Sequence, residues 1–370
     1  MVREWDPRTA PSTEIETMVS ALNAMLAVDL PDDPPWRTDA FREYLSVTMP
    51  GERRVIWIAE ASPGSAGEDK PDGESLLGQA NVLLFDKMAV LEVHVHPAAR
   101  RSGVGRELLT AAVNRANEEG FATLGVEVIG GTPAAGFYES MGFTCAYVET
   151  RSVLELSTVD WNKLGEMAGG VAAGYRIEYY RGGPPEELYA SYAAAKYAAH
   201  AADDDLGDLD LRPSSYDANR LRNSLMTLHM RGLKPYIVVA THEATGEVAG
   251  LTEVVVAAQH PDRADQYDTI VVPNHRGYGL SRAIKARMLF ELRSAEPRLK
   301  SVQTWHSYDM ESLVKVNSDI GFRPDREWRE YEADVAGVAA RLAAPRRSKT
   351  RSGRRGQAAS GTVVPGAASP

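Results

Sequence analysis

The residues best suited to do chemistry form a short glycine-rich segment, Arg-Arg-Ser-Gly-Val-Gly at 100–105. It follows residues 91–97, which alternate apolar and polar types and end in proline, as does a strand that leaves its sheet. Beyond it, apolar residues recur on one face and predict a helix. Glycines permit close backbone approach, and the N–H groups and dipole of a helix N-terminus favour anions. The segment therefore predicts a pyrophosphate cradle.

Two nucleotide-binding motifs fit this segment less well. A Walker loop requires Gly-Lys followed by Ser or Thr, which the segment lacks. A dinucleotide fingerprint requires a third glycine and normally follows the first strand of a βαβ unit, whereas this segment begins only at residue 100. A second motif decides the interpretation.

That second motif lies at 133–143 and reads Pro-Ala-Ala-Gly-Phe-Tyr-Glu-Ser-Met-Gly-Phe, after an apolar strand at 124–129. Together the two motifs resemble those of the GNAT superfamily of N-acyltransferases, in which an Arg-x-x-Gly-x-Gly loop precedes a helix carrying Phe-Tyr-x-x-x-Gly-Phe. The resemblance covers most of residues 1–150 in element order, and its strong motifs lie within 91–143.

The resemblance implies roles for individual residues. Acetyl-CoA would lie between two splayed parallel strands that end near Val95 and Ile129. Backbone groups around Val93 and Val95 would hold the thioester carbonyl, and Tyr138 would protonate the departing thiolate. The cofactor-binding residues expected in this half are Val93, His94, Val95, Arg100, Arg101, Ser102, Gly103, Val104, Gly105, Arg106 and Phe137.

Attack by an amine also requires a general base, and two carboxylates are candidates. Glu92 lies on the strand that leads into the cradle, and Glu127 lies on the partner strand. The alternative interpretation is that each carboxylate simply faces solvent from its strand and has no catalytic role. His94 or His96 could then relay the proton instead. One position departs from the family: many relatives have Asn where this chain has Gly131, so contacts to the pantetheine arm differ there.

The chain repeats itself with a period near 175 residues. Gly103 matches Gly277 and Gly105 matches Gly279, each 174 apart, and each half ends in a Gly-Phe pair. A duplicated α/β domain explains this repeat. With the resemblance, it predicts an α/β (α+β) fold with two tandem GNAT domains, each a mixed, centrally splayed sheet flanked by helices. The predicted divisions are an N-terminal domain at 1–156, a linker at 157–174, a C-terminal domain at 175–336 and a disordered basic tail at 345–370.

The second half resembles the family less directly. Residues 266–280 look like the cofactor loop of actinobacterial tandem GNAT proteins, the group that includes mycothiol synthase, but Asn317 stands where the first half has Tyr138. Three interpretations of the second half stay open. It is catalytically silent and shapes the acceptor pocket of the first half, it binds CoA without turnover, or it is the active unit with Tyr278 or His306 as the acid. Its expected cofactor-binding residues are Val271, Arg276, Gly277, Tyr278, Gly279 and Leu280.

Composition narrows the function classes. The net charge of −10 includes six basic residues in the tail, so the rest of the chain carries −16, which disfavours nucleic acid and suits an amine substrate. The single cysteine, Cys145, excludes an intrachain disulfide, and no apolar run is long enough to span a membrane. We expect a cytoplasmic monomer whose two domains pack as a pseudo-dimer, with no metal and no membrane partner.

The predicted function is N-acetyl transfer from acetyl-CoA to a primary amine of a small molecule or peptide, by direct attack. Two alternatives stay open at this point. One is a reaction like that of mycothiol synthase on a cysteinyl sugar, which the tandem layout favours and the altered second half disfavours. The other is a non-catalytic CoA-binding or sensing protein, against which Tyr138 and Glu92 weigh.

Overall fold

The computed structural model describes residues 1–61, 76–202, 216–307 and 309–344. The predicted basic tail at 345–370 therefore lies outside the described residues. The polar, Gly- and Pro-containing sequence at 64–74 and the aspartate-rich run at 203–210 also lie outside the described residues.

The first half of the chain alternates strands and helices in the predicted order. Its elements are β1 (Val2–Trp5), α1 (Ser12–Asp29), α2 (Thr38–Ser46), β2 (Arg53–Glu60), β3 (Leu76–Phe85), β4 (Met88–Val95), α3 (Val104–Glu118), β5 (Thr123–Ile129), α4 (Pro133–Met141) and β6 (Thr144–Glu155). A further helix, α5 (Trp161–Gly169), falls in the predicted linker and packs on a helix of the second half, α8 (Leu280–Ala295).

The second half repeats this order. Its elements are β7 (Tyr175–Arg181), α6 (Tyr189–Ala202), α7 (Ala218–Met230), β8 (Leu233–His242), β9 (Val248–Ala257), β10 (Arg263–Val271), α8 (Leu280–Ala295), β11 (Ser301–His306), α9 (Glu311–Ile320), β12 (Arg323–Asp334) and α10 (Val335–Ala343). The mixed α/β fold predicted from the sequence is thereby confirmed.

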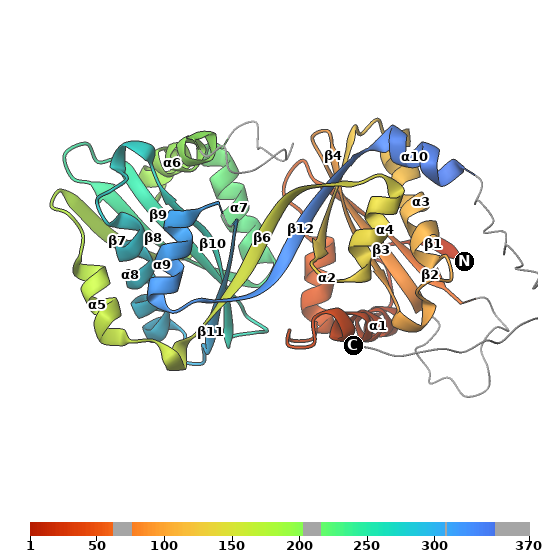
Figure 1. The fold of residues 1–370 in the computed structure, drawn as a ribbon, viewed down its shortest axis with the longest axis horizontal. Coiled ribbons are helices and arrows are strands. Elements are labelled where there is room, and N and C mark those ends of the chain that lie inside the picture. Colours follow the sequence, from red (N-terminus) through yellow and green to blue (C-terminus); the bar gives the residue numbers. More distant parts are fainter. Residues whose placement is uncertain (62–75, 203–215, 308, 345–370) are drawn as a thin grey trace, which may run out of the picture.

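A single sheet runs through both halves. Within the described residues it has twelve strands in the order β1-β2-β3-β4-β5-β12-β6-β11-β10-β9-β8-β7. The last strand of each half is exchanged: β12 pairs with β5 of the first half, and β6 pairs with β11 of the second. β6 and β12 also pair with each other along the crossing between the halves, seen in yellow and blue in Figure 1.

Each half contains one parallel strand pair that separates partway along. β4 pairs with β5 from Met88 to Leu91 only, and β10 pairs with β11 from Arg263 to Gln266 only. Beyond these positions the two strands diverge. The predicted central splay is therefore present in both halves, and in the first half it opens where Glu92 begins the last four residues of β4.

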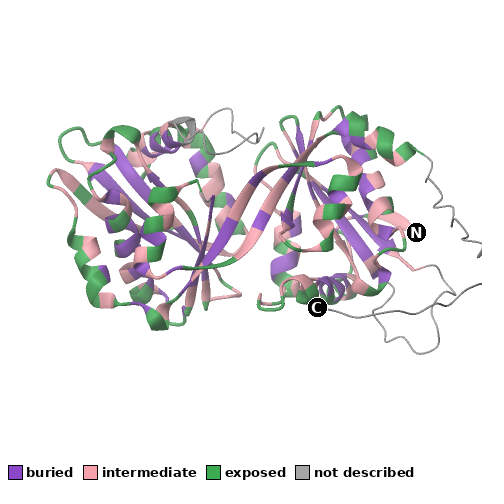
Figure 2. Cartoon of the chain, viewed as in Figure 1, coloured by how far each residue is buried: buried purple, intermediate pink, exposed green. Residues whose placement is uncertain are grey.

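Helices cover both faces of the sheet, and the buried strand residues between them form the cores, drawn in purple in Figure 2. In the first half α3 covers one face, and α1 and α2 cover the other. Tyr331 of β12 and Val335 of α10 belong to the core under α3. Leu154 of β6 and Leu164 of α5 belong to the corresponding core under α8. Each core is completed by residues from the other side of the exchange.

Candidate active site

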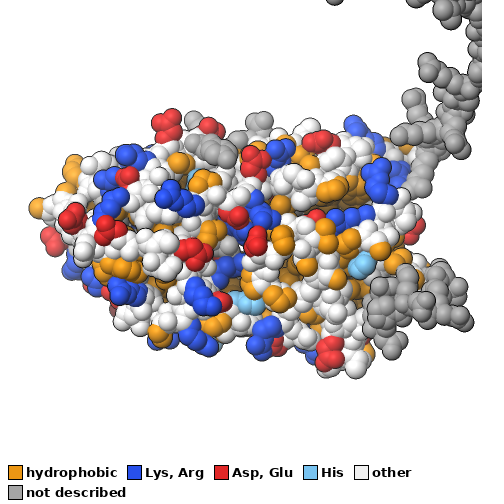
Figure 3. Space-filling model, turned by 60° about the horizontal axis from the view of Figure 1, so that its bottom comes forward, with side chains coloured by type: hydrophobic (Ala, Val, Ile, Leu, Met, Phe, Trp, Pro, Cys, Tyr) orange, Lys and Arg blue, Asp and Glu red, His pale blue; other side chains and the backbone are white. Residues whose placement is uncertain are grey.

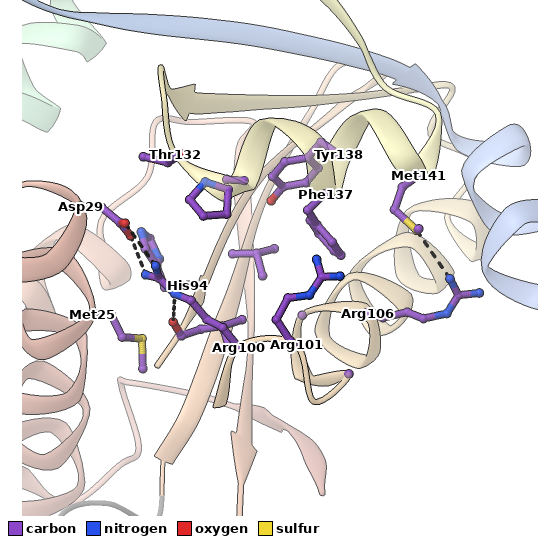
Figure 4. A pocket seen from close by; sticks show the side chains of 16 residues that line it. Met25, Asp29, His94, Arg100, Arg101, Arg106, Thr132, Phe137, Tyr138 and Met141 are labelled. Carbon is purple, nitrogen blue, oxygen red and sulfur yellow. Dashed lines mark hydrogen bonds and ion pairs between the residues drawn. The ribbon is translucent and has the colours of Figure 1, made fainter. Parts of the chain in front are cut away.

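Nine of the eleven predicted cofactor residues of the first half line a cavity of about 370 Å³ beside the splayed strands, shown in Figure 4. Ser102, Val104 and the two predicted carboxylates, Glu92 and Glu127, are not among its lining residues. The cavity lies between the end of β4, the start of α3 and one face of α4. Its lining residues are Met25, Asp29, Val93, His94, Val95, Arg100, Arg101, Gly103, Gly105, Arg106, Thr132, Pro133, Ala134, Phe137, Tyr138 and Met141. The volume is within the range of pockets that hold small molecules and cofactor arms.

The glycine-rich loop turns sharply into α3. Arg101 has a φ of 67° and Gly103 a φ of 108°, so both lie in the left-handed region. Gly103 is the N-cap residue of α3, whose first turn begins at Val104 and leaves backbone N–H groups without helical partners. At Gly105, a Cβ atom would lie 3.4 Å from Val95 Cγ2 and 3.7 Å from Phe137 Cζ. Gly105, which has no side chain of its own, lines the cavity with its backbone.

Several predicted phosphate ligands already have partners. The Arg100 guanidinium forms two bonds to the Asp29 carboxylate, at 2.6 and 3.2 Å, and its Nε donates to the Val95 carbonyl at 3.2 Å. Arg106 donates to the carbonyls of Arg341 and Leu342 at the end of α10, at 3.1 and 2.7 Å.

Ser102 Oγ donates to the Ala99 carbonyl at 2.6 Å. Arg101 is exposed and lines the cavity. Arg101 and the first-turn N–H groups of α3 are therefore the groups best placed to meet an anion.

Tyr138 lies on α4 with its side chain only 3% exposed. Phe137 and Phe143 contact its ring edge-to-face, each with centroids 5.1 Å away, and so fix its orientation. Figure 4 shows the hydroxyl directed into the cavity. Burial, and then the carboxylate of Glu92, raise the pKa of Tyr138 well above its ordinary value. The phenol therefore keeps its proton at neutral pH.

Glu92 is half-buried at the point where β4 leaves β5. Its Oε1 accepts a hydrogen bond from the Tyr44 hydroxyl of α2, and its Oε2 accepts one from Asn81 Nδ2 of β3 at 2.9 Å. These two bonds fix the carboxylate on the face of the sheet covered by α1 and α2.

Glu127 faces the same side of the sheet. Its side chain reaches solvent, yet partial desolvation by the surrounding protein raises its pKa to about 8, and the carboxylates of Glu330, Glu149 and Glu92 add to the effect. Glu330 stands directly opposite it across the strand pair, where like charges repel. Burial and Glu330 also raise the pKa of Glu149 to about 7. This concentration of carboxylates favours a cationic group beside it.

The two predicted alternatives for proton relay lie at the end of β4. Burial lowers the pKa of His94, which is therefore neutral at pH 7. Gln79 Nε2 lies 3.4 Å from His94 Nδ1. His96 Nδ1 accepts from the Ala98 backbone N–H at 3.3 Å, a local turn contact. Only His94 lines the cavity.

The second half has a similar turn, and it corrects the predicted correspondence of glycines. Gly279, with a φ of 78°, is the N-cap residue of α8 as Gly103 is of α3, and these two positions are 176 apart rather than 174. Gly277, with a φ of 86°, therefore corresponds to Arg101, and Ser281 corresponds to Gly105. The sequence comparison aligned glycine with glycine, whereas the structure aligns the residues that have the same backbone conformation and the same position relative to the helix.

A segment of the chain lies against this second turn. A Cβ atom on Gly279 would lie 2.9 Å from the Gly170 carbonyl oxygen, and Ala172 N–H donates to the Tyr278 carbonyl at 3.5 Å. Arg276 Nε donates to the Val271 carbonyl at 3.3 Å, as Arg100 does to Val95. The residues that follow α5 thus pack where an anion would approach α8.

The residue that replaces the tyrosine in the second half is also enclosed. Phe322 N–H bonds to the Asn317 carbonyl as Phe143 N–H does to Tyr138, so Asn317 is its structural counterpart. The Asn317 amide is buried, and neither of its polar atoms has a hydrogen-bond partner among the described residues. His306 is also buried, with Nε2 3.1 Å from Ser152 Oγ.

Six cavity-lining residues were missed in the sequence. Met25 and Asp29 come from α1, whose approach to the loop depends on the Arg100–Asp29 pair. The others belong to the start and inner face of α4: Thr132, Pro133, Ala134 and Met141. Thr132 is the N-cap residue of α4, and Pro133 follows it at the first helical position. This pair is typical of a helix start, so the start of α4 at Pro133 could have been predicted from the sequence.

Acidic and basic side chains are interspersed on the face drawn in Figure 3, so the excess negative charge is not concentrated there. Among the described residues, no helix is long and apolar enough to cross a membrane. In the same part of the chain, no group of three or more His, Cys, Asp or Glu side chains is arranged to hold a metal ion.

Comparisons with known proteins find GNAT proteins both by sequence and by fold. Residues 25–143 match the model of the acetyltransferase (GNAT) family. A solved tandem GNAT protein from the clavulanic acid biosynthesis pathway is 23% identical, with a TM-score of 0.73 over 90% of this chain and 98% of that one. A GCN5-related N-acetyltransferase from Sphaerobacter thermophilus is 14% identical, with a TM-score of 0.64 over 90% and 95% of the two chains. No curated protein matches the chain by sequence.

Proposed function

Because residues 25–143 carry a domain of the acetyltransferase (GNAT) family within a tandem GNAT fold, we propose that this chain transfers an acetyl group from acetyl-CoA to a primary amine. The family and fold support acyl transfer in general. The observation that carries the finer proposal is the common cavity of Tyr138, the end of β4 and the glycine loop.

The described residues fit acetyl-CoA in three respects. The first turn of α3 offers backbone N–H groups and a positive dipole end to a pyrophosphate. Gly105 leaves space beside Val95 and Phe137 that a side chain would fill. The gap between β4 and β5 beyond Leu91 suits an extended arm. Acetyl-CoA, when bound, supplies the acyl group as an activated thioester.

We assign the proton transfers to two residues on opposite sides of the gap. Glu92 takes a proton from the ammonium group of the acceptor, directly or through a water, and the bonds from Tyr44 and Asn81 hold it in place. Tyr138, which stays protonated at neutral pH, gives its phenolic proton to the sulfur as the C–N bond forms and the C–S bond breaks, and the second proton that the attacking nitrogen loses restores the phenol. Glu127 is the alternative base, and its raised pKa suits that role.

We infer that the second half is catalytically silent. Asn317 replaces the phenol, Ser281 replaces Gly105, and residues 170–172 pack against the N-terminus of α8. The division into domains at 1–156 and 175–336, the monomeric state and the cytoplasmic location stay predictions.

Thiol release from acetyl-CoA, measured over a panel of primary amines, tests the proposal. We expect turnover with at least one amine and a loss of about 100-fold or more in kcat for Tyr138→Phe, with the affinity for CoA unchanged. Tyr331→Phe is the matched control, because Tyr331 is a buried tyrosine whose hydroxyl bonds to Glu139 rather than facing the cavity. Tight CoA binding without turnover on any amine would instead support the sensing alternative.

A further inference from the structure

The end of α7, in the second half, contacts the end of α2 in the first half. Arg231 is the C-cap residue of α7, and its backbone N–H is bonded to Thr227 and Leu228. Its side chain crosses to the first half, where Nε and Nη2 both donate to the Val47 carbonyl just after α2, at 3.0 and 2.7 Å. The geometry therefore ties the two helices together through one guanidinium.

The same guanidinium also borders the tyrosine that holds Glu92. Arg231 Cζ lies 5.7 Å from the centroid of the Tyr44 ring, and Arg54 Cζ lies 4.4 Å from it. Trp36 contacts the ring as well, with centroids 5.3 Å apart. Cations near an aromatic face are attracted to it. Tyr44 is thus confined while its hydroxyl bonds to Glu92.

We propose that Arg231, contributed by the silent half, is a positioning residue for the active site of the first half. It holds the end of α2 and the ring of Tyr44, and through the Tyr44 hydroxyl it fixes the carboxylate of Glu92. This inference rests on the proposed function, in which Glu92 is the base. It gives the second half a defined task, which is to keep that base oriented.

A double-mutant cycle separates this role from a general effect on stability. We expect Arg231→Met to lower kcat about 10-fold and leave KM for acetyl-CoA unchanged, because Arg231 does not line the cavity. In a Tyr44→Phe background the same change is expected to cost less than 2-fold, because the connection to Glu92 is already broken. Arg231→Lys, which keeps a donor and a charge, is expected to recover most of the loss. Full additivity of the two substitutions would overturn the proposal.

Arg222→Met is the matched control, because Arg222 lies on the same helix, pairs with Glu186 and is exposed. We expect its kcat to equal that of the wild type. A second readout needs no acceptor: the ¹³C signal of the Glu92 carboxyl group, identified by its loss in Glu92→Gln, should move in Arg231→Met and stay in Arg222→Met.

An unmoved carboxyl signal in folded Arg231→Met would refute the link whatever the activity. Absence of turnover by the wild type would refute the proposed function alone, since the ¹³C comparison still tests the link.

Discussion

Gly105→Ala separates cofactor binding from folding, because the structure predicts that this substitution raises the stability of the fold and weakens the affinity for CoA. Gly105 is the second residue of α3 and has no positive φ, so alanine fits its backbone. The added methyl group would lie at ordinary contact distances, 3.4 Å from Val95 Cγ2 and 3.7 Å from Phe137 Cζ. Replacing a helical glycine with alanine stabilises a helix by about 0.5–1 kcal/mol, with less at the first turn. We therefore expect the Tm to rise by about 1–2 °C.

The methyl group would at the same time occupy space beside the backbone that meets the pyrophosphate. Losing one hydrogen bond to a charged group costs about 1.5–3 kcal/mol, which corresponds to roughly a 10- to 100-fold weaker Kd for CoA. Calorimetric titration with CoA and a thermal melt of the same sample measure both effects. Ser281→Ala, at the counterpart position in α8, is the control and is expected to leave Kd unchanged.

Two results would refute this reasoning. An unchanged Kd in Gly105→Ala, with the expected rise in Tm, would mean that close backbone approach at this position is not needed for the cofactor. A weaker Kd together with a Tm several degrees lower would mean that the substitution damages the fold, and that the contact distances around Gly105 misjudge the available space.

Three further outcomes are expected. Gly103→Glu should abolish acetyl transfer. Gly277→Glu strains a backbone with a φ of 86° but meets no atom within 4 Å, and it should keep most of the activity at a temperature where the variant is folded; equal losses in the two folded variants would contradict a silent second half. Because the pKa of Glu127 is raised from 4.5 to about 8 in the folded state, the folded chain binds more protons than the unfolded chain between these pH values, and the free energy of unfolding falls as pH rises. In thermal melts from about pH 5 to 9, the Tm of Glu127→Gln should therefore depend less on pH than the Tm of the wild type. The kcat of this variant should change less than about 3-fold. Burial lowers the pKa of Lys285 from 10.5 to about 7, so the free energy of unfolding should rise with pH between these values. Lys285→Met should remove this pH dependence and raise the Tm at about pH 7. An unchanged pH dependence would mean that Lys285, whose Nζ donates to Gln266 Oε1 at 2.6 Å, stays charged.

The parts of the site that are local in sequence could be predicted from it. The strand, the turn and the helix at 91–118 follow from alternation, from Pro97 and from glycine at the N-cap, all of which act within a few residues. The helix carrying Tyr138 ends at Gly142 in the left-handed region, as the Gly-Phe pair indicates. These features depend on backbone conformations that only certain residue types adopt easily.

The parts that depend on distant partners could not be predicted. Nothing around Arg100 indicates that Asp29 would take its guanidinium, because the pair joins segments that meet only in the fold. The matching of the two halves by glycine type failed because Arg101, a non-glycine residue, adopts the left-handed conformation that Gly277 adopts in the other half. The exchange of β6 and β12 is equally invisible, since an antiparallel strand has the same alternation whichever neighbour it pairs with.

That exchange has a consequence for how the chain folds as it leaves the ribosome. The outer edge of β5 pairs with β12, so Glu127 meets its neighbour Glu330 only when almost the whole described chain has been made. Until then the first half presents an open strand edge and an incomplete core, which still lacks Tyr331 and Val335. Contacts of such long sequence separation form slowly, and open edges invite association with other chains. Nascent chains truncated before β12 should therefore depend on chaperones, and release of the finished chain should end that dependence.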